Sequence, residues 1–106
     1  MASSRLIVSK FGGSSCGNAA AYRRLGQYFT EQHDAGHKCV GVFSAMFAVT
    51  DRLLNAIQSA RVDDADGVAA ARNSIWDLHA RTARDLLVDN GNVEESLDWI
   101  DARLQQ

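Results

Sequence analysis

One lysine and a run of glycines and serines near the start of the chain have the composition of an anion-binding turn. Lys10 ends an apolar run that begins with Leu6–Val8, and the segment Gly12–Gly17 follows it. Branched aliphatic residues favour a buried β-strand, glycine favours the turn that ends it, and helical spacing begins at about Asn18. Backbone N–H groups and the helix dipole at such a junction hold anions, commonly phosphate, and Lys10 adds a full positive charge. The junction therefore predicts a phosphate-handling turn.

A second junction of the same kind follows about thirty residues later. Residues 38–43, KCVGVF, are short, apolar and rich in β-formers, and hydroxyl groups stand at both ends of the next loop, at Ser44 and Thr50. In a parallel sheet both junctions follow the carboxyl ends of strands, where open α/β sheets bind ligands. We therefore expect Lys10, the glycine turn, Ser44 and Thr50 to share one pocket.

A structural interpretation of these residues stays open beside the functional one. The lysine precedes the glycines, so neither the Walker pattern G-x-x-x-x-G-K-[ST] nor the Rossmann pattern G-x-G-x-x-G is present. Gly12-Gly13 and the serines after it could form an ordinary connection with Lys10 facing solvent. Thr50 could be a helix cap alone, and Ser44 could satisfy a nearby backbone group.

The elements that position these residues follow from hydrophobic spacing. Residues 18–35 repeat apolar positions at three and four, which predicts an amphipathic helix capped by Asn18 and stopped by Gly36. Strand, helix and strand within about forty residues form a βαβ unit, whose strands are parallel. The expected fold class is α/β, with parallel strands covered by helices.

Three helices are expected after this unit. Thr50 is a good N-cap residue for the first, which has an apolar stripe at Leu53, Leu54, Ile57 and Ala60. The acidic stretch 63–67 lacks the twelve-residue calcium pattern, so we interpret it as a solvated turn that caps a long helix over about 66–88, and we expect no metal site. Asn90-Gly91 would end that helix, and Asn92 with Glu95 would cap the last one.

Composition narrows the classes of function. The chain has 106 residues, 46% of them hydrophobic, with a net charge of -2 and a pI near 5.8, which predicts one domain without a basic field for nucleic acid or anionic membranes. No segment has the roughly 20 apolar residues of a membrane span. Cys16 and Cys39 lack metal-ligand spacing, which favours reduced thiols and a cytoplasmic location.

Two segments together carry a resemblance to a known family. KFGGSS at Lys10–Ser15 and SAMFAVTDRLL at Ser44–Leu54, in this order, resemble the start of the aspartate kinases of the amino-acid kinase superfamily. The hydroxyl pair after KFGG separates aspartate kinases from relatives that act on glutamate, N-acetylglutamate, carbamate or UMP. The chain corresponds to the N-terminal segment of that kinase domain, over residues 1–106, and the implied fold is a partial three-layer amino-acid-kinase fold.

The resemblance implies phosphorylation of the side-chain carboxylate of L-aspartate by ATP with nucleotide-bound Mg²⁺, the first step toward lysine, methionine and threonine. Lys10 matches the catalytic lysine that contacts the ATP phosphates. Gly12, Gly13 and Ser14 match the phosphate-binding turn. Ser44 and Thr50 match hydroxyl positions in the aspartate-binding region.

Two departures from the family pattern limit what this chain can do alone. Ala48 stands where the family usually has glycine, so a positive φ at this position would be strained by about 1 kcal/mol. The chain also matches only about the first quarter of an aspartate kinase. Two strands cannot bury both faces of a sheet, so we expect a fold that is incomplete and inactive unaided. The alternative is a catalytically silent remnant that associates with itself or with a full-length kinase.

Overall fold

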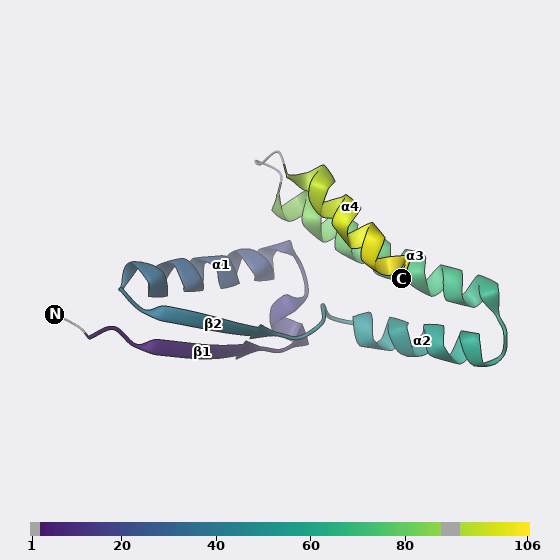
Figure 1. The fold of residues 1–106 in the computed structure, drawn as a ribbon, viewed down its shortest axis with the longest axis horizontal. Helices are drawn as coiled ribbons and strands as arrows, with labels where there is room; N and C mark the ends of the chain where they lie inside the picture. Colours follow the sequence, from purple (N-terminus) through teal and green to yellow (C-terminus); the bar gives the residue numbers. More distant parts are fainter. Residues whose placement is uncertain (1–2, 88–91) are drawn as a thin grey trace. The chain divides into compact units, whose positions relative to one another are not determined.

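The computed structural model describes residues 3–87 and 92–106, and it divides the chain into two compact units, Met1–Phe47 and Ala48–Gln106. The first contains β1 (Leu6–Phe11), the 3-10 helix η1 (Gly13–Cys16), α1 (Ala19–Asp34) and β2 (Lys38–Phe43). The second contains α2 (Val49–Arg61), α3 (Ala65–Leu86) and α4 (Val93–Leu104) (Figure 1). The described chain is therefore mixed α/β, with four α-helices and one two-stranded sheet, as the hydrophobic spacing predicted.

The first unit is the predicted βαβ unit. β1 and β2 pair in parallel, with Leu6 opposite Lys38 and Phe11 opposite Phe43, and α1 connects them. The observed bounds of β2 equal the predicted range 38–43, and α1 differs from the predicted helix by one residue at each end. The expectation of parallel strands is confirmed.

The two ends of α1 are set by the residues that the sequence predicted, Asn18 at the start and Gly36 after the end. The Asn18 side-chain oxygen accepts a hydrogen bond of 2.8 Å from the backbone N–H of Ala21, which satisfies a donor left free at the first turn. Gly36 follows the last turn with φ +85°, a conformation that glycine adopts without steric penalty. These two residues set the length of the crossover helix.

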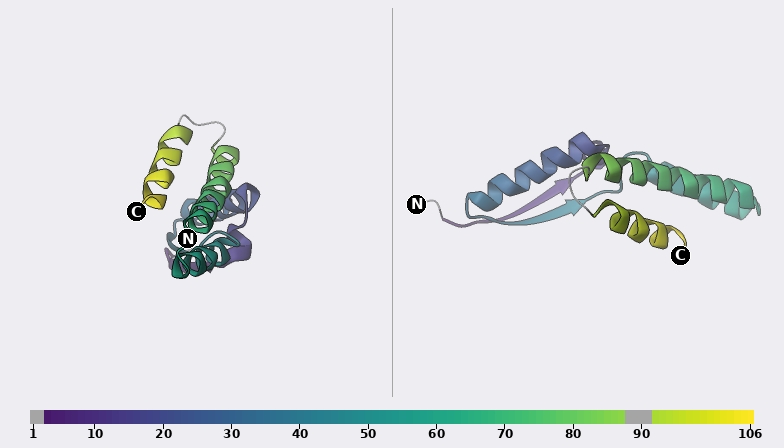
Figure 2. Two further views of the ribbon diagram at one scale, coloured as in Figure 1. Left: turned by 90° about the vertical axis from the view of Figure 1, so that its right-hand side faces the viewer. Right: turned by 90° about the horizontal axis from the view of Figure 1, so that it is seen from above.

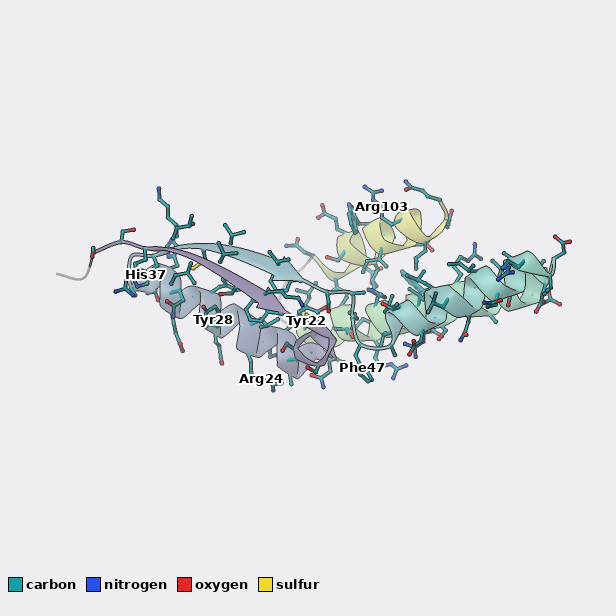
Figure 3. All side chains as sticks on the ribbon, turned by 90° about the horizontal axis from the view of Figure 1, so that it is seen from below. Tyr22, Arg24, Tyr28, His37, Phe47 and Arg103 are labelled. Atoms are coloured by element: carbon teal, nitrogen blue, oxygen red, sulfur yellow. The ribbon has the colours of Figure 1, made fainter. Side chains whose placement is uncertain are left out.

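One face of the strand pair packs against α1 through an aromatic cluster. Phe11 stacks on Phe43 at 5.3 Å between ring centroids and meets Phe29 edge-on at 5.6 Å. Tyr28, labelled on α1 in Figure 3, meets Phe11 edge-on and shares a hydrogen bond of 2.9 Å between its hydroxyl and Ser9 Oγ. Such ring pairs add about 0.5–1.5 kcal/mol each beyond area burial, so this cluster holds α1 on the sheet.

The other face of the strand pair is open to solvent. Its aliphatic side chains are exposed by 68% at Leu6, 63% at Val8, 46% at Val40 and 50% at Val42. The same face carries Lys10 and Lys38, because side chains two residues apart on a strand point the same way. The prediction that two strands would leave apolar residues uncovered is confirmed.

The second unit is built from helices, and α3 contacts both α2 and α4 (Figure 2). Asp64 caps α3, its side-chain oxygen accepting a hydrogen bond of 2.9 Å from the N–H of Gly67, as expected of the acidic stretch. Asn92 stands at the N-cap of α4 as predicted, but its side chain does not make the capping hydrogen bond to the first turn that was expected of it. The predicted break at Asn90-Gly91 lies outside the described residues.

The ionisation of Tyr22 should make the first unit less stable at alkaline pH. Burial raises the pKa of its phenol above the ordinary value of 10.0, and the neighbouring Cys16 sulfur, itself fully buried and a hydrogen-bond partner, raises the pKa further. A raised pKa in the folded state means that folding favours the protonated phenol, so this stabilisation is complete below pH 10.0 and is lost as the pH rises through the folded-state value. As the pH rises through this range, the free energy of unfolding should therefore fall less for Tyr22→Phe than for the wild type, which denaturant unfolding at several pH values measures. Equal losses in the two proteins would contradict the assignment.

Candidate functional site

Lys10 lies next to the last residue of β1 and is exposed. It stands opposite Val42 of β2, on the sheet face that α1 does not cover. Lys10 thus stands near the carboxyl end of its strand, as predicted, and this is the edge where open α/β sheets bind ligands.

The glycine turn has a different physical basis from the one expected. We expected glycine at Gly12 because glycine tolerates backbone angles that other residues avoid. Gly12 instead has φ −80°, which any residue can adopt, and among the described glycines only Gly36, outside this turn, has a positive φ. A Cβ built at Gly12 would meet no atom of the described residues within 4 Å. Neither the backbone conformation nor packing against residues 3–87 and 92–106 requires glycine at this position, so the missing side chain leaves space for a ligand to approach the backbone.

The turn itself is partly helical. Gly13–Cys16 form η1, and the Ser15 N–H donates a 3.0 Å hydrogen bond to the Gly12 carbonyl. The connection between β1 and α1 is therefore the short helix η1 rather than an irregular loop, and α1 begins at Ala19, within one residue of the predicted start. Ser14 lies within η1 and is exposed.

Ser44 lies beside the glycine turn. Its backbone N–H donates a 3.0 Å hydrogen bond to the Phe11 carbonyl, which extends the strand pairing by one residue. Its Oγ is 3.9 Å from the position that a Cβ on Gly13 would occupy, and it donates a 2.7 Å hydrogen bond to the Ala45 carbonyl. The structure thus brings the end of β2 and the glycine turn together, as the parallel-sheet argument predicted.

Thr50 does not have the capping role predicted for it. α2 begins at Val49 and its N-cap residue is Ala48, which has no side chain able to accept a hydrogen bond. Thr50 is exposed as the second residue of the helix, and Asp51 lies in the first turn as expected. Thr50 belongs to the second unit and the other five predicted site residues belong to the first, so the pocket shared with Thr50 stays a prediction.

Ala48 has φ +69°, in the left-handed region, so the expectation of strain at this position is confirmed. Replacing Ala48 with glycine should raise the free energy of unfolding by about 1 kcal/mol, because glycine adopts this conformation without the clash of a Cβ. Ala60→Gly, inside α2, is the matched control and should lose about 1 kcal/mol. Denaturant unfolding of both variants checks the prediction, and a loss of stability in both would contradict it.

One cation near Thr50 was missed by the sequence argument. The Nη1 atom of Arg52 is buried and, among the described residues, has no hydrogen-bond partner. A buried guanidinium donor without a partner is unfavourable, and an anionic group is the partner that would satisfy it best. In the sequence Arg52 is simply the arginine of VTDRLL, and its spacing does not show whether its side chain is buried or exposed to solvent.

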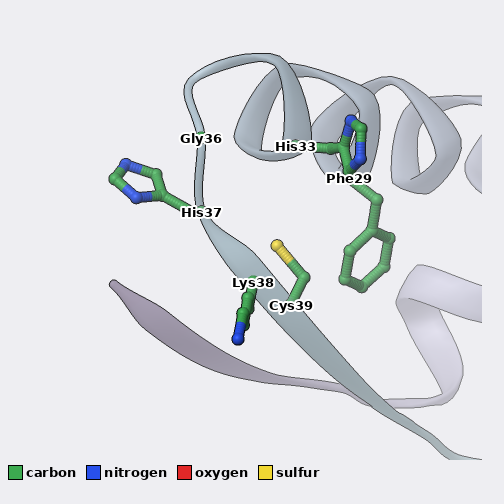
Figure 4. A pocket seen from close by; sticks show the side chains of 6 residues that line it. All are labelled: Phe29, His33, Gly36, His37, Lys38 and Cys39. Atoms are coloured by element: carbon green, nitrogen blue, oxygen red, sulfur yellow. The ribbon is translucent and has the colours of Figure 1, made fainter. Parts of the chain in front are cut away.

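A second hollow lies at the other end of the sheet and is separate from this site. It has a volume of about 650 Å³ and is lined by Phe29, His33, Gly36, His37, Lys38 and Cys39 (Figure 4). The His37 Nδ1 atom accepts a 3.2 Å hydrogen bond from the Arg5 N–H, which leaves the other ring nitrogen as the one that carries hydrogen. The hollow adjoins the amino end of β2, whereas ligands of α/β sheets bind at carboxyl ends.

Comparison with known proteins adds no family to this description: no family model, no curated protein and no solved structure matches the chain. Within residues 3–87 and 92–106, no helix is both long and apolar enough to cross a membrane. The same residues contain no group of three or more metal-ligating side chains placed to hold an ion. The resemblance to aspartate kinases therefore rests on the two motifs and on the positions of their residues.

Proposed function

We propose that this chain is the N-terminal segment of an aspartate kinase, which transfers a phosphoryl group from ATP to the side-chain carboxylate of L-aspartate. The observation that supports the proposal is that the open Gly12 backbone follows Lys10 by two residues at the carboxyl end of a parallel strand pair, where Ser44 lies beside Gly13. Phosphoryl transfer depends mainly on positioning and on charge stabilisation, and a lysine with backbone N–H donors supplies both. The proposed fold is part of the three-layer amino-acid-kinase fold.

Each residue has a defined task in this proposal. Lys10 binds the ATP phosphates and stabilises the negative charge that develops during transfer. Gly12, Gly13 and Ser14 surround the phosphates, with Gly12 leaving its backbone accessible. Ser44 and Thr50 hold aspartate, and Mg²⁺ enters with the nucleotide.

The exposed sheet face supports the view that this segment does not act alone. Leu6 and Val8 are more than 60% exposed on a strand pair whose other face is covered by α1. Burying such residues contributes roughly 1.5–3 kcal/mol each, so a completed kinase domain gains stability by covering them. In this proposal the reaction takes place in the cytoplasm and requires the rest of the kinase domain.

The same exposed face favours a second candidate function. A catalytically silent segment that pairs with a full-length kinase would use this face without performing chemistry. An assay for aspartyl hydroxamate, with ATP, magnesium, aspartate and hydroxylamine, separates the two when the chain is mixed with the remainder of an aspartate kinase domain. Activity that appears only in this mixture supports the first function. In a second experiment the chain is added to a full-length aspartate kinase. Co-purification of the two without any change in the activity of the kinase supports the second function.

A pair of glycine variants tests the phosphate turn directly. Gly12→Ala should weaken binding of MgATP by about tenfold, because its methyl group occupies the space proposed for phosphate, while the free energy of unfolding changes by less than about 0.5 kcal/mol. The matched control is Gly26→Ala in α1, where a Cβ also meets no atom within 4 Å in the part of the chain that the structure describes. It should keep the wild-type affinity and gain about 1 kcal/mol of stability. Titration calorimetry measures the affinities, and equal affinity in the wild type and Gly12→Ala would contradict the proposed site.

A further inference from the structure

The outer face of α2 exposes three large aliphatic side chains. Leu53, Leu54 and Ile57 are exposed by 48%, 54% and 55%, and their spacing of one and four residues places them on one face of the helix. The positions of α2 that are buried or half-buried follow a different stripe, Val49, Arg52, Ala56 and Ser59. α2 is therefore a helix with apolar residues on the side that it does not use for packing.

The charges at the two ends of α2 indicate what covers this face. Asp51 lies in the first turn and Arg61 in the last turn, and both are exposed. Two copies of α2 related by a two-fold axis perpendicular to the helix run antiparallel, which places Asp51 of each copy near Arg61 of the other and Leu54 opposite Ile57. A parallel pair would instead place like charges together. The face is thus complementary to itself in the antiparallel arrangement, which also aligns the helix dipoles favourably.

The exposed sheet face of the first unit lacks this property. Its strand positions hold Leu6, Val8, Val40 and Val42 with two lysines, Lys10 and Lys38, and no carboxylate. A second copy of the same face would bring cations together without an acidic partner. Charge complementarity therefore favours α2 as the surface for self-association.

We infer that the chain forms a two-fold symmetric dimer through antiparallel contact of the Leu53, Leu54 and Ile57 faces of α2. Three half-exposed side chains per copy make a small contact compared with the roughly 800 Å² per partner of stable complexes, so the dissociation constant should be on the order of 100 μM. Thr50 lies one turn before Leu54 on this face, so the dimer would cover the hydroxyl assigned to aspartate binding. The association itself does not depend on the proposed function.

Sedimentation equilibrium of the full chain over a wide range of concentrations tests the inference. The wild type should pass from monomer to dimer, and Ile57→Asp should stay monomeric. Val8→Asp, a matched control at an equally exposed aliphatic residue of the sheet face, should dimerise like the wild type. A wild type that stays monomeric throughout, or dimerisation that Val8→Asp abolishes and Ile57→Asp preserves, would overturn the inference.

Exchanging the charges tests the antiparallel arrangement without altering the apolar face. Asp51→Arg and Arg61→Asp should each raise the dissociation constant by about twofold to fivefold, and the double variant should restore it. The two residues are ten positions apart in one helix, too far to pair within a copy, so rescue reports pairing between copies. Circular dichroism confirms that each variant keeps its helices. Failure of the double variant to recover affinity would overturn the antiparallel dimer.

Discussion

Replacing Lys10 with methionine should weaken binding of MgATP by about 10- to 100-fold and leave the free energy of unfolding nearly unchanged. A charge-assisted hydrogen bond to phosphate contributes about 1.5–3 kcal/mol, which corresponds to that change in affinity. Stability should not change much because Lys10 is exposed at the end of β1, and methionine keeps the length of its aliphatic stem. Calorimetric titration with MgATP, together with denaturant unfolding, measures both quantities.

Lys38 provides a matched control for Lys10. It is exposed on the same sheet face but lies at the amino end of β2, away from the glycine turn. Lys38→Met should therefore keep the wild-type affinity for MgATP. Equal losses at both lysines would indicate a general electrostatic attraction to the nucleotide and would contradict a site at the carboxyl ends of the strands.

Replacing Gly41 with alanine should destabilise the chain by about 1–3 kcal/mol, the usual range for overpacking. A Cβ on Gly41 would lie 2.6 Å from a ring carbon of Phe43 and 2.8 Å from one of Phe29, distances that real contacts do not reach. The rings must therefore move, which disturbs the stacking of Phe43 on Phe11 and the contact of Phe29 with both. Denaturant unfolding followed by tyrosine fluorescence or circular dichroism measures the loss.

Gly26→Ala is the control for Gly41→Ala because the substitution is the same but the new methyl group meets no neighbour within 4 Å. The two variants should change stability in opposite directions, since alanine is the better helix former at Gly26. A Gly41→Ala variant as stable as the wild type would show that the rings of Phe29 and Phe43 rearrange freely. In that case the aromatic cluster would not be what holds α1 on the sheet.

The βαβ unit shows what could be predicted from local patterns. Strand 38–43 and the helix capped by Asn18 and ended by Gly36 were predicted within one residue, because caps, turns and periodicity act over a few neighbouring positions. Thr50 shows where such patterns fail. Its residue type suits an N-cap, but the N-cap of α2 lies two residues earlier, at a left-handed Ala48, and residue type alone does not reveal that position.

The apolar stripe of α2 shows a second limit. Its periodicity predicted a helix correctly, but the same spacing could not say that Leu53, Leu54 and Ile57 would remain exposed. Burial depends on which neighbour a helix meets, and the half-buried positions of α2 follow a different stripe. Hydrophobic spacing therefore identifies a face without identifying its partner.

For the candidate site, the sequence alone determined that a lysine stands at the end of the first strand, that a glycine turn follows it and that a hydroxyl follows the second strand, because these features depend on residue type and order. Only the tertiary structure decided that Gly12 has open space around it, that Ser44 lies beside Gly13, and that Arg52 holds a buried donor without a partner among the described residues. Those properties depend on distances between residues far apart in the chain. They arise when β1 and β2 pair and the helices pack, and no local pattern contains them.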